Sequence, residues 1–113
     1  MANVTTLELK AAVEFGVITN LKIDLWRQRL ELTVYVYKHG ALSVQHLSFE
    51  EVARFEWISN AKAEWELAEV TQIEIERRTE SDEVIAAMEL WDVARLVVSC
   101  KRVVWNDATV TAD

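Results

Sequence analysis

Residues 24–37, DLWRQRLELTVYVY, contain the pattern that decides the fold. The aliphatic residues at positions 30, 32, 34 and 36 fall on one side of an alternation, and Tyr35 and Tyr37 fall on the other. Strict alternation is typical of a β-strand whose two faces have different surroundings. The sequence therefore predicts a strand with a buried aliphatic face, and it raises the question of what the tyrosine face meets.

The preceding segment, VITNLKIDL, alternates in the same way and predicts an antiparallel partner for this strand. A four-residue connection at residues 26–29 would pair Leu25 with Leu30 and bring the aliphatic rows of both strands to one face. The same register places Asp24 opposite Glu31, which is an unfavourable like-charge pair. We expect a hairpin with a longer loop, because no glycine or asparagine favours a two-residue turn.

A third strand is expected to follow this hairpin. The tripeptide KHG predicts a turn in which Gly40 adopts a positive φ, and ALSVQHLSF then shows strand alternation. The apolar residues at positions 42 and 44 are out of phase with those at 47 and 49, so the sequence predicts a β-bulge near Gln45 and His46. Three consecutive antiparallel strands would form a meander.

The second half of the chain is less uniform. AKAEWELAEV is rich in helix formers and predicts a short helix or an irregular segment at about residues 60–69. VTQIEIERR returns to strand alternation. Residues 84–91 fit a strand and residues 82–91 fit a helix, and both alternatives remain open. ARLVVSCKRVVW is strand-like as far as Trp105.

Together these segments predict a mainly β fold, with a β-rich α+β fold as the alternative. We expect an antiparallel meander that forms a small sandwich or a half-open barrel, with one short helix. The length of 113 residues suggests a single domain, 1–113, and no linker divides it, since the chain has two glycines and no proline. We expect about ten residues at the N-terminus and about seven at the C-terminus to fray.

The formal net charge is −7, and its distribution is uneven. Residues 50–83 hold eleven acidic and four basic side chains, whereas the rest of the chain holds eight of each. A net acidic chain without a basic stripe argues against direct binding of nucleic acid, because such binding requires cations that neutralise phosphates. A basic protein partner is compatible with this charge, and so is simple solubility.

The composition indicates neither a membrane span nor a secretory signal. No apolar run approaches the roughly 18 residues that a span needs, and the N-terminal residues lack the basic region and apolar core of a signal peptide. The single cysteine, Cys100, excludes an internal disulfide. These features predict a cytoplasmic location and no membrane partner.

Residues that could support catalysis are few. Cys100 lies in an apolar run, so we interpret it as a core residue rather than a nucleophile. The two histidines, His39 and His46, are too few for a typical zinc site, and the two isolated glycines cannot build a phosphate-binding loop. We therefore predict no catalytic residue, no metal and no cofactor.

Three aromatic residues and a row of acids form the candidate protein interface. Trp26 lies in the predicted hairpin loop, where burial is difficult, and Tyr35 and Tyr37 share with Ile18 the face opposite the aliphatic row. We expect this face to be covered, either by later segments of the same chain or by another chain. The candidate acids, whose alternative interpretation is a solvated face, are Glu64, Glu66, Glu69, Glu74 and Glu76.

A family resemblance is carried by five segments, which in order are VITNLKIDL, LSFEEV, WELAEV, TQIEIE and LVVSCKRVVW. They cover most of the chain, contain no diagnostic motif, and resemble small bacterial toxin-immunity proteins. The resemblance implies a short, acidic, cytosolic and non-catalytic protein that caps a toxin. It assigns no role to an individual residue.

Three functions follow as hypotheses. The first is a non-enzymatic protein-binding module, in one form an immunity or inhibitor protein that caps a basic partner through its acidic segment and aromatic anchors. The second is a self-associating structural domain that forms a homodimer through its aromatic face. The third is a small-ligand binder or an enzyme whose site is assembled across the fold.

Overall fold

The computed structural model describes residues 3–62 and 64–111. Within these ranges the chain forms one helix and ten strands. In chain order they are β1 (Asn3–Thr5), α1 (Thr6–Val13), β2 (Val17–Asp24), β3 (Arg29–Lys38), β4 (Ala41–Glu50), β5 (Arg54–Ser59), β6 (Ala68–Arg78), β7 (Glu83–Leu90), β8 (Ala94–Cys100), β9 (Arg102–Trp105) and β10 (Ala108–Thr111). The prediction of a mainly β fold with one short helix is confirmed.

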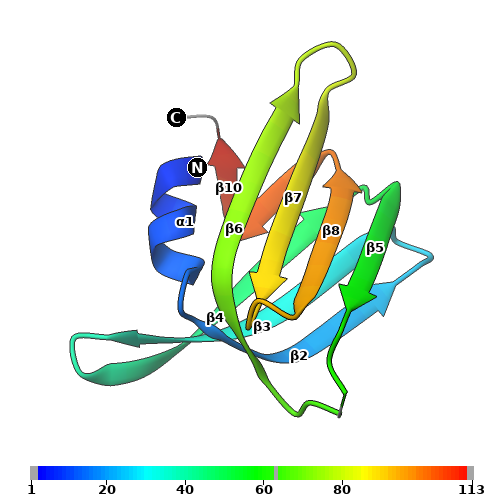
Figure 1. Ribbon diagram of the computed structural model, residues 1–113. Coiled ribbons are helices and arrows are strands. Elements are labelled where there is room, and N and C mark those ends of the chain that lie inside the picture. Colours follow the sequence, from blue (N-terminus) through cyan, green and yellow to red (C-terminus); the bar gives the residue numbers. More distant parts are fainter. Residues whose placement is uncertain (1–2, 63, 112–113) are drawn as a thin grey trace.

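All of these strands belong to one sheet, in the order β1-β10-β9-β4-β3-β2-β6-β7-β8-β5, which does not close into a barrel. Neighbouring strands are antiparallel, except for the parallel pair β1 and β10. The sheet curls so that β6, β7, β8 and β5 cross in front of β2, β3 and β4 (Figure 1). We call β6-β7-β8-β5 the front half-sheet and β1-β10-β9-β4-β3-β2 the rear half-sheet. The fold is thus the half-open form of the predicted architecture.

Two strands pass from one half-sheet to the other through a shared corner. β4 continues into β5 after a short connection, and β8 continues into β9 at Lys101. Backbone hydrogen bonds hold this corner: the Lys101 amide donates to the Glu50 carbonyl at 3.1 Å, and the Ala53 amide donates to the Ser99 carbonyl at 2.9 Å. Glu51 has a left-handed φ of 54°, which supplies the sharp change of direction.

Apolar side chains fill the space between the half-sheets. Alternate residues of the central strands face inward, as strand geometry requires, and the fully buried ones include Leu30, Leu32, Val34, Leu47, Phe49, Val70, Ile73, Met88, Leu96 and Val98. α1 lies beside β6 and β10 (Figure 1) and adds Leu9 and Val13 to this core. Removal of this surface from water is the main favourable term in folding.

The predicted fraying of both chain ends is wrong for the described residues. Residues 3–13 form β1 and α1, and β1 pairs with β10 at residues 109–111. A capping box begins α1: the Glu8 amide donates to Thr5 Oγ1 at 3.1 Å, and the Thr5 amide donates to Glu8 Oε1 at 3.2 Å. The predicted fraying of residues 1–2 and 112–113 lies outside the described residues.

The predicted β2–β3 hairpin is present, but its register differs by two residues. Asp24 lies opposite Arg29, so the turn comprises residues 25–28. The predicted like-charge pair of Asp24 with Glu31 is therefore wrong, and Glu31 lies opposite Lys22 instead. The inward face is unchanged because the shift is an even number of residues.

The irregularity of this region lies in β2 rather than in β4. The predicted bulge near Gln45 and His46 is wrong, because β3 and β4 pair without a register shift. A shift occurs instead between Ile18 and Asn20. It turns Ile18 inward opposite Val34, so the prediction that Ile18 shares the tyrosine face is also wrong.

Neither segment with an ambiguous sequence pattern is helical in the part of the chain that the structure describes. Residues 60–67 form an irregular connection and not a helix, apart from residue 63, which lies outside the described residues. β7 is a strand in which every second residue is buried, so the helical alternative at residues 82–91 is wrong. The predicted turn at KHG is confirmed, with a φ of 77° at Gly40.

Candidate functional site: the groove between β2 and β5

Two of the strand edges that lack a strand partner within residues 3–62 and 64–111 belong to β2 and β5. β2 pairs with β3 along its length but with β6 only at Val17 and Ile18. β5 pairs with β8 on one side and is the last strand of the sheet. The backbone groups along the free edges of residues 19–24 and 54–59 are therefore available to a new partner.

The two free edges border an apolar groove, which we call the β2–β5 groove. Leu21 and Ile23 of β2, like Phe55 and Trp57 of β5, face the core, because each lies opposite a buried residue of the neighbouring strand. Their side chains nevertheless remain between 39% and 48% exposed. Large apolar residues that face a core are normally covered, so the sheet leaves its interior open along this line.

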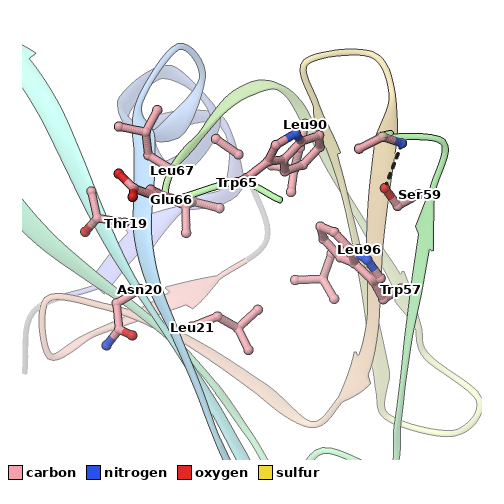
Figure 2. A pocket seen from close by; sticks show the side chains of 13 residues that line it. Thr19, Asn20, Leu21, Trp57, Ser59, Trp65, Glu66, Leu67, Leu90 and Leu96 are labelled. Carbon is pink, nitrogen blue, oxygen red and sulfur yellow. Dashed lines mark hydrogen bonds between the residues drawn. The ribbon is translucent and has the colours of Figure 1, made fainter. Parts of the chain in front are cut away.

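The groove contains two hollows. The first has a volume of about 360 Å³, and Figure 2 shows Leu21 on one side of it and Trp57 and Leu96 on the other. The second, of about 320 Å³, lies between the β2–β3 turn and the start of β5. Beyond it the Val52 amide donates to the Gln28 carbonyl at 2.8 Å, and this hydrogen bond ties the β2–β3 turn to the corner. Each hollow has the size of a typical ligand site.

β2 and β5 run in opposite directions along the groove. The first hollow is lined by the start of β2, at Ile18, and by the end of β5, at Ser59. The second hollow is lined by the end of β2, at Asp24, and by the start of β5, at Arg54. The arrowheads of the two strands accordingly point to different ends of the molecule (Figure 1). A strand laid in the groove would be antiparallel to one edge and parallel to the other.

Two tryptophans, Trp57 and Trp65, line the first hollow, and a third, Trp91, packs against Trp65. Trp65, from the 60–67 connection, meets Trp57 edge-on with ring centroids 6.2 Å apart and planes at 81°. It meets Trp91 at 5.2 Å and 82°. Edge-to-face contacts of this kind are favourable for aromatic rings. They hold the 60–67 connection across the end of the front half-sheet and give the groove a preformed wall.

The predicted aromatic interface residues lie outside the groove. Trp26, at the β2–β3 turn, is 98% exposed. Tyr35 and Tyr37 lie on the outer face of the β3–β4 hairpin, opposite Val44 and Leu42. The prediction that later segments of the chain cover this face is wrong for Tyr37, which is 74% exposed, whereas cover by another chain stays a prediction. Tyr35 is half-buried, and the part of the hairpin that holds Tyr37 extends beyond the core.

The candidate acids do not converge on one site. They divide between the 60–67 connection, with Glu64 and Glu66, and the outward positions of β6, with Glu69, Glu74 and Glu76. Glu66 is the one that lines the groove among the described residues (Figure 2). Glu74 accepts hydrogen bonds from Gln72 at 2.8 Å and Lys10 at 3.2 Å, and these contacts lower the pKa of its carboxyl. The acids of this segment are thus a dispersed surface charge.

Metal-ligating groups and the single cysteine are two of the features that the sequence offers for catalysis. No group of three His, Cys, Asp or Glu side chains in residues 3–62 and 64–111 is placed to hold a metal ion. Cys100 is buried, and burial raises the pKa of its thiol to about 11, which makes it a weak nucleophile at neutral pH. What the groove offers is recognition through apolar contacts and backbone hydrogen bonds.

Apart from Glu66, the residues that line the groove are not among the interface residues predicted from sequence. Alternation places Leu21, Ile23, Phe55 and Trp57 on inward faces, and inward apolar residues normally belong to a core. No local signal distinguishes them, because their exposure depends on which strands pair around the sheet. The prediction from sequence therefore had the correct side of β2 but not its surroundings, and it made no assignment for β5.

Comparison of the sequence with models of known protein families gives no match, and comparison with curated proteins gives none either. In the part of the chain that the structure describes, no helix has the length and apolar character needed to cross a membrane. A proposal for the function therefore rests on the geometry of the β2–β5 groove.

Proposed function

We propose that this chain is a non-enzymatic protein-binding module that takes an extended segment of a partner protein into the β2–β5 groove. The observation that carries the proposal is the exposure of four core-facing apolar side chains, Leu21, Ile23, Phe55 and Trp57, between two unpaired strand edges. An extended segment would use both features. Its backbone would pair with a free edge, and its alternate side chains would enter the groove.

The energetics of such binding follow from the groove. Apolar surface that leaves water contributes about 25 cal/mol per Å², and the hollows present Leu21, Trp57 and Phe55 for this contact. Both edges belong to strands that are already formed, so little ordering of this chain opposes binding. Capping of a toxin, which the family resemblance implies, would be one form of this function if the captured segment belonged to the toxin's working surface.

The replacement of Ile23 by aspartate is expected to weaken binding of groove-directed peptides by about tenfold or more, because it places a charge in the apolar groove. The ligands would be peptides selected from a random display library on the immobilised protein. We expect the selected sequences to alternate apolar and polar residues. Fluorescence anisotropy of a labelled selected peptide would measure the affinity.

Ile58→Asp is the matched control. Ile58 is on the strand that forms the other side of the groove, is exposed, and faces outward, since it lies opposite Arg95 and next to the inward Trp57. The same substitution there should leave peptide affinity unchanged, and urea unfolding would confirm that both variants are folded. Selected peptides without alternation, or equal effects of the two substitutions, would contradict the proposal.

A second candidate function, self-association, is favoured by the outer face of the β3–β4 hairpin. Tyr35 with Val44 and Tyr37 with Leu42 form two cross-strand apolar pairs there. Toward the hairpin tip, β2 pairs with β3 no further than Tyr35, and β9 pairs with β4 no further than Leu47. The hairpin beyond these points projects alone (Figure 1). An exposed apolar patch on a projecting ribbon suits a homodimer.

If this face associates, replacing Tyr37 and Leu42 together by glutamate should convert a dimer into a monomer. Light scattering at low and high salt would measure the mass. The dimer of the unsubstituted chain should persist at high salt, because an apolar interface is not screened. A monomer at both salts for the unsubstituted chain would exclude this candidate and leave the groove proposal unaffected.

A further inference from the structure

The two ends of the β2–β5 groove carry opposite charges that have no ion-pair partner among the described residues. Arg54 lines the second hollow from an outward position of β5, since it precedes the inward Phe55, and Glu66 lines the first. Neither makes an ion pair within residues 3–62 and 64–111. Between them the groove is lined mainly by apolar side chains. The groove therefore has a positive charge at one end, a negative charge at the other, and an apolar centre.

The other charges at the second hollow are already engaged. Asp24 accepts from Arg27 at 3.0 Å, and hydrogen bonds from Arg27 lower the pKa of its carboxyl. Arg29 lies 3.6 Å from Glu31 and 3.5 Å from Glu50. Among the residues that the structure describes, Arg54 is thus the cation lining this hollow that is free to pair with a ligand.

From this arrangement we infer that the groove takes a strand that begins with an acidic residue, continues with alternating apolar residues, and ends with a basic residue. The inference rests on the proposed function, since it names the chemistry of the segment that the same groove would hold. The acidic residue would lie at Arg54 and the basic residue at Glu66. The strand would run antiparallel to β2.

The expected direction of the bound strand follows from the antiparallel pairing of β6 with β2. β6 is antiparallel to β2 at Val17 and Ile18, and it leaves the same edge free from Thr19 onward. A strand that continues this antiparallel ladder runs opposite to β2, and antiparallel pairing is slightly more stable per residue than parallel pairing. β2 runs from the Glu66 end of the groove to the Arg54 end. The N-terminal residue of the bound strand therefore lies near Arg54.

The length of the free edge sets the length of the segment. Residues 19–24 of β2 are unpaired on the groove side, and residues 54–59 of β5 match them. At about 3.3 Å per residue such an edge accommodates a strand of about six residues. Every second side chain of this strand would point into the groove, toward Leu21, Ile23 and Trp57.

Two synthetic peptides of identical composition test the inference. Both are capped at their ends and have valine alternating with threonine; one begins with glutamate and ends with lysine, and the other has these two residues exchanged. We expect the chain to bind the peptide that begins with glutamate about threefold to tenfold more tightly, the range expected of two exposed ion pairs. This preference should decrease as the salt concentration rises.

A charge exchange in the protein should reverse the preference. The double variant Arg54→Glu, Glu66→Arg keeps the net charge and should favour the peptide that begins with lysine. The control double variant Lys38→Glu, Glu76→Arg also keeps the net charge, changes exposed residues that do not line either hollow, and should leave the preference unchanged. Urea unfolding would show that both are folded.

The outcomes separate this inference from the function on which it rests. Equal binding of the two peptides, or preference of the unsubstituted chain for the peptide that begins with lysine, overturns the inference while peptide binding itself is retained. No binding of either peptide, together with failure of the display selection, overturns the proposed function as well. A preference that reverses only with the Arg54 and Glu66 exchange supports both.

Discussion

Replacing Phe49 by alanine is expected to lower the free energy of unfolding by about 3–5 kcal/mol. Phe49 is completely buried, on β4 between Leu30 of β3 and Val103 of β9. Removal of its ring forfeits apolar burial and leaves a cavity that the strands on either side cannot fill without breaking their hydrogen bonds. Because total stabilities of small domains are about 5–15 kcal/mol, the variant should lose a large part of its stability.

Urea unfolding of the unsubstituted chain and of the Phe49→Ala variant would measure this loss, provided that the free energy falls with denaturant at the same slope in both. Phe15→Ala is the matched control, since Phe15 is 73% exposed. Its φ is 70°, and alanine is a non-glycine residue like phenylalanine, so the substitution does not relieve the backbone strain there. We expect the control to change stability by about 0.5 kcal/mol or less. Equal losses in both variants would mean that Phe49 does not occupy the centre of the core.

The thiol of Cys100 is expected to react at least about 100-fold more slowly in the folded chain than in the unfolded chain at about pH 8. Burial raises its pKa from 9.0 to about 11, so the thiolate, which is the reactive form, becomes about 100-fold rarer in the folded state. Exclusion of the reagent from the core adds to this difference. Labelling with a thiol reagent, with and without urea, would measure the two rates. Similar rates would contradict the placement of Cys100 in the core.

The same pKa shift predicts how stability depends on pH. The unfolded chain loses the Cys100 proton near pH 9 and the folded chain near pH 11, so between these values the unfolded state binds fewer protons. Stability should therefore fall as the pH rises through this window, and the thiol should have no effect on stability below it. A Cys100→Ala variant should show a shallower fall between pH 9 and 11, and a fall of equal slope would contradict the shift.

Several strands and turns could be predicted from the sequence because their signals are local, whereas β1, β5 and β10 were not predicted. β3 and β6 follow from alternation within a few residues, and the turn at His39 and Gly40 follows from glycine at a position with a positive φ. The capping box of α1 is also local: Thr5 and Glu8 have the required spacing just before an apolar run. That helix could therefore have been predicted from the residues that begin it.

The register of β2 against β3 depends on the turn at residues 25–28, whose geometry is only weakly indicated by its sequence. Gln28 adopts a φ of 53° to close the turn, a conformation that glycine or asparagine would have indicated more clearly. The useful signal was electrostatic. The predicted register paired Asp24 with Glu31, and a shift of two residues pairs Asp24 with Arg29.

The groove could not be predicted, because it results from contacts between residues far apart in the chain. Leu21 and Trp57 have the same inward phase as residues that are fully buried. Whether they are covered depends on the corner at Glu51 and on the early departure of β6 from β2. The phase change in β4 was visible in the sequence, but it marks the end of the core beneath the hairpin and not a bulge.

The parallel pair of β1 and β10 has a consequence for the kinetics of folding. Asn3 pairs with Thr109, about a hundred residues along the chain, so this contact closes a very long loop and carries a large entropic cost. Contacts between residues so far apart in sequence are expected to form slowly. α1 is joined to β1, so Leu9 and Val13 are expected to dock late. Until then the space between the two half-sheets is open at the α1 end as well as along the groove, and this partly folded form is the one most exposed to aggregation.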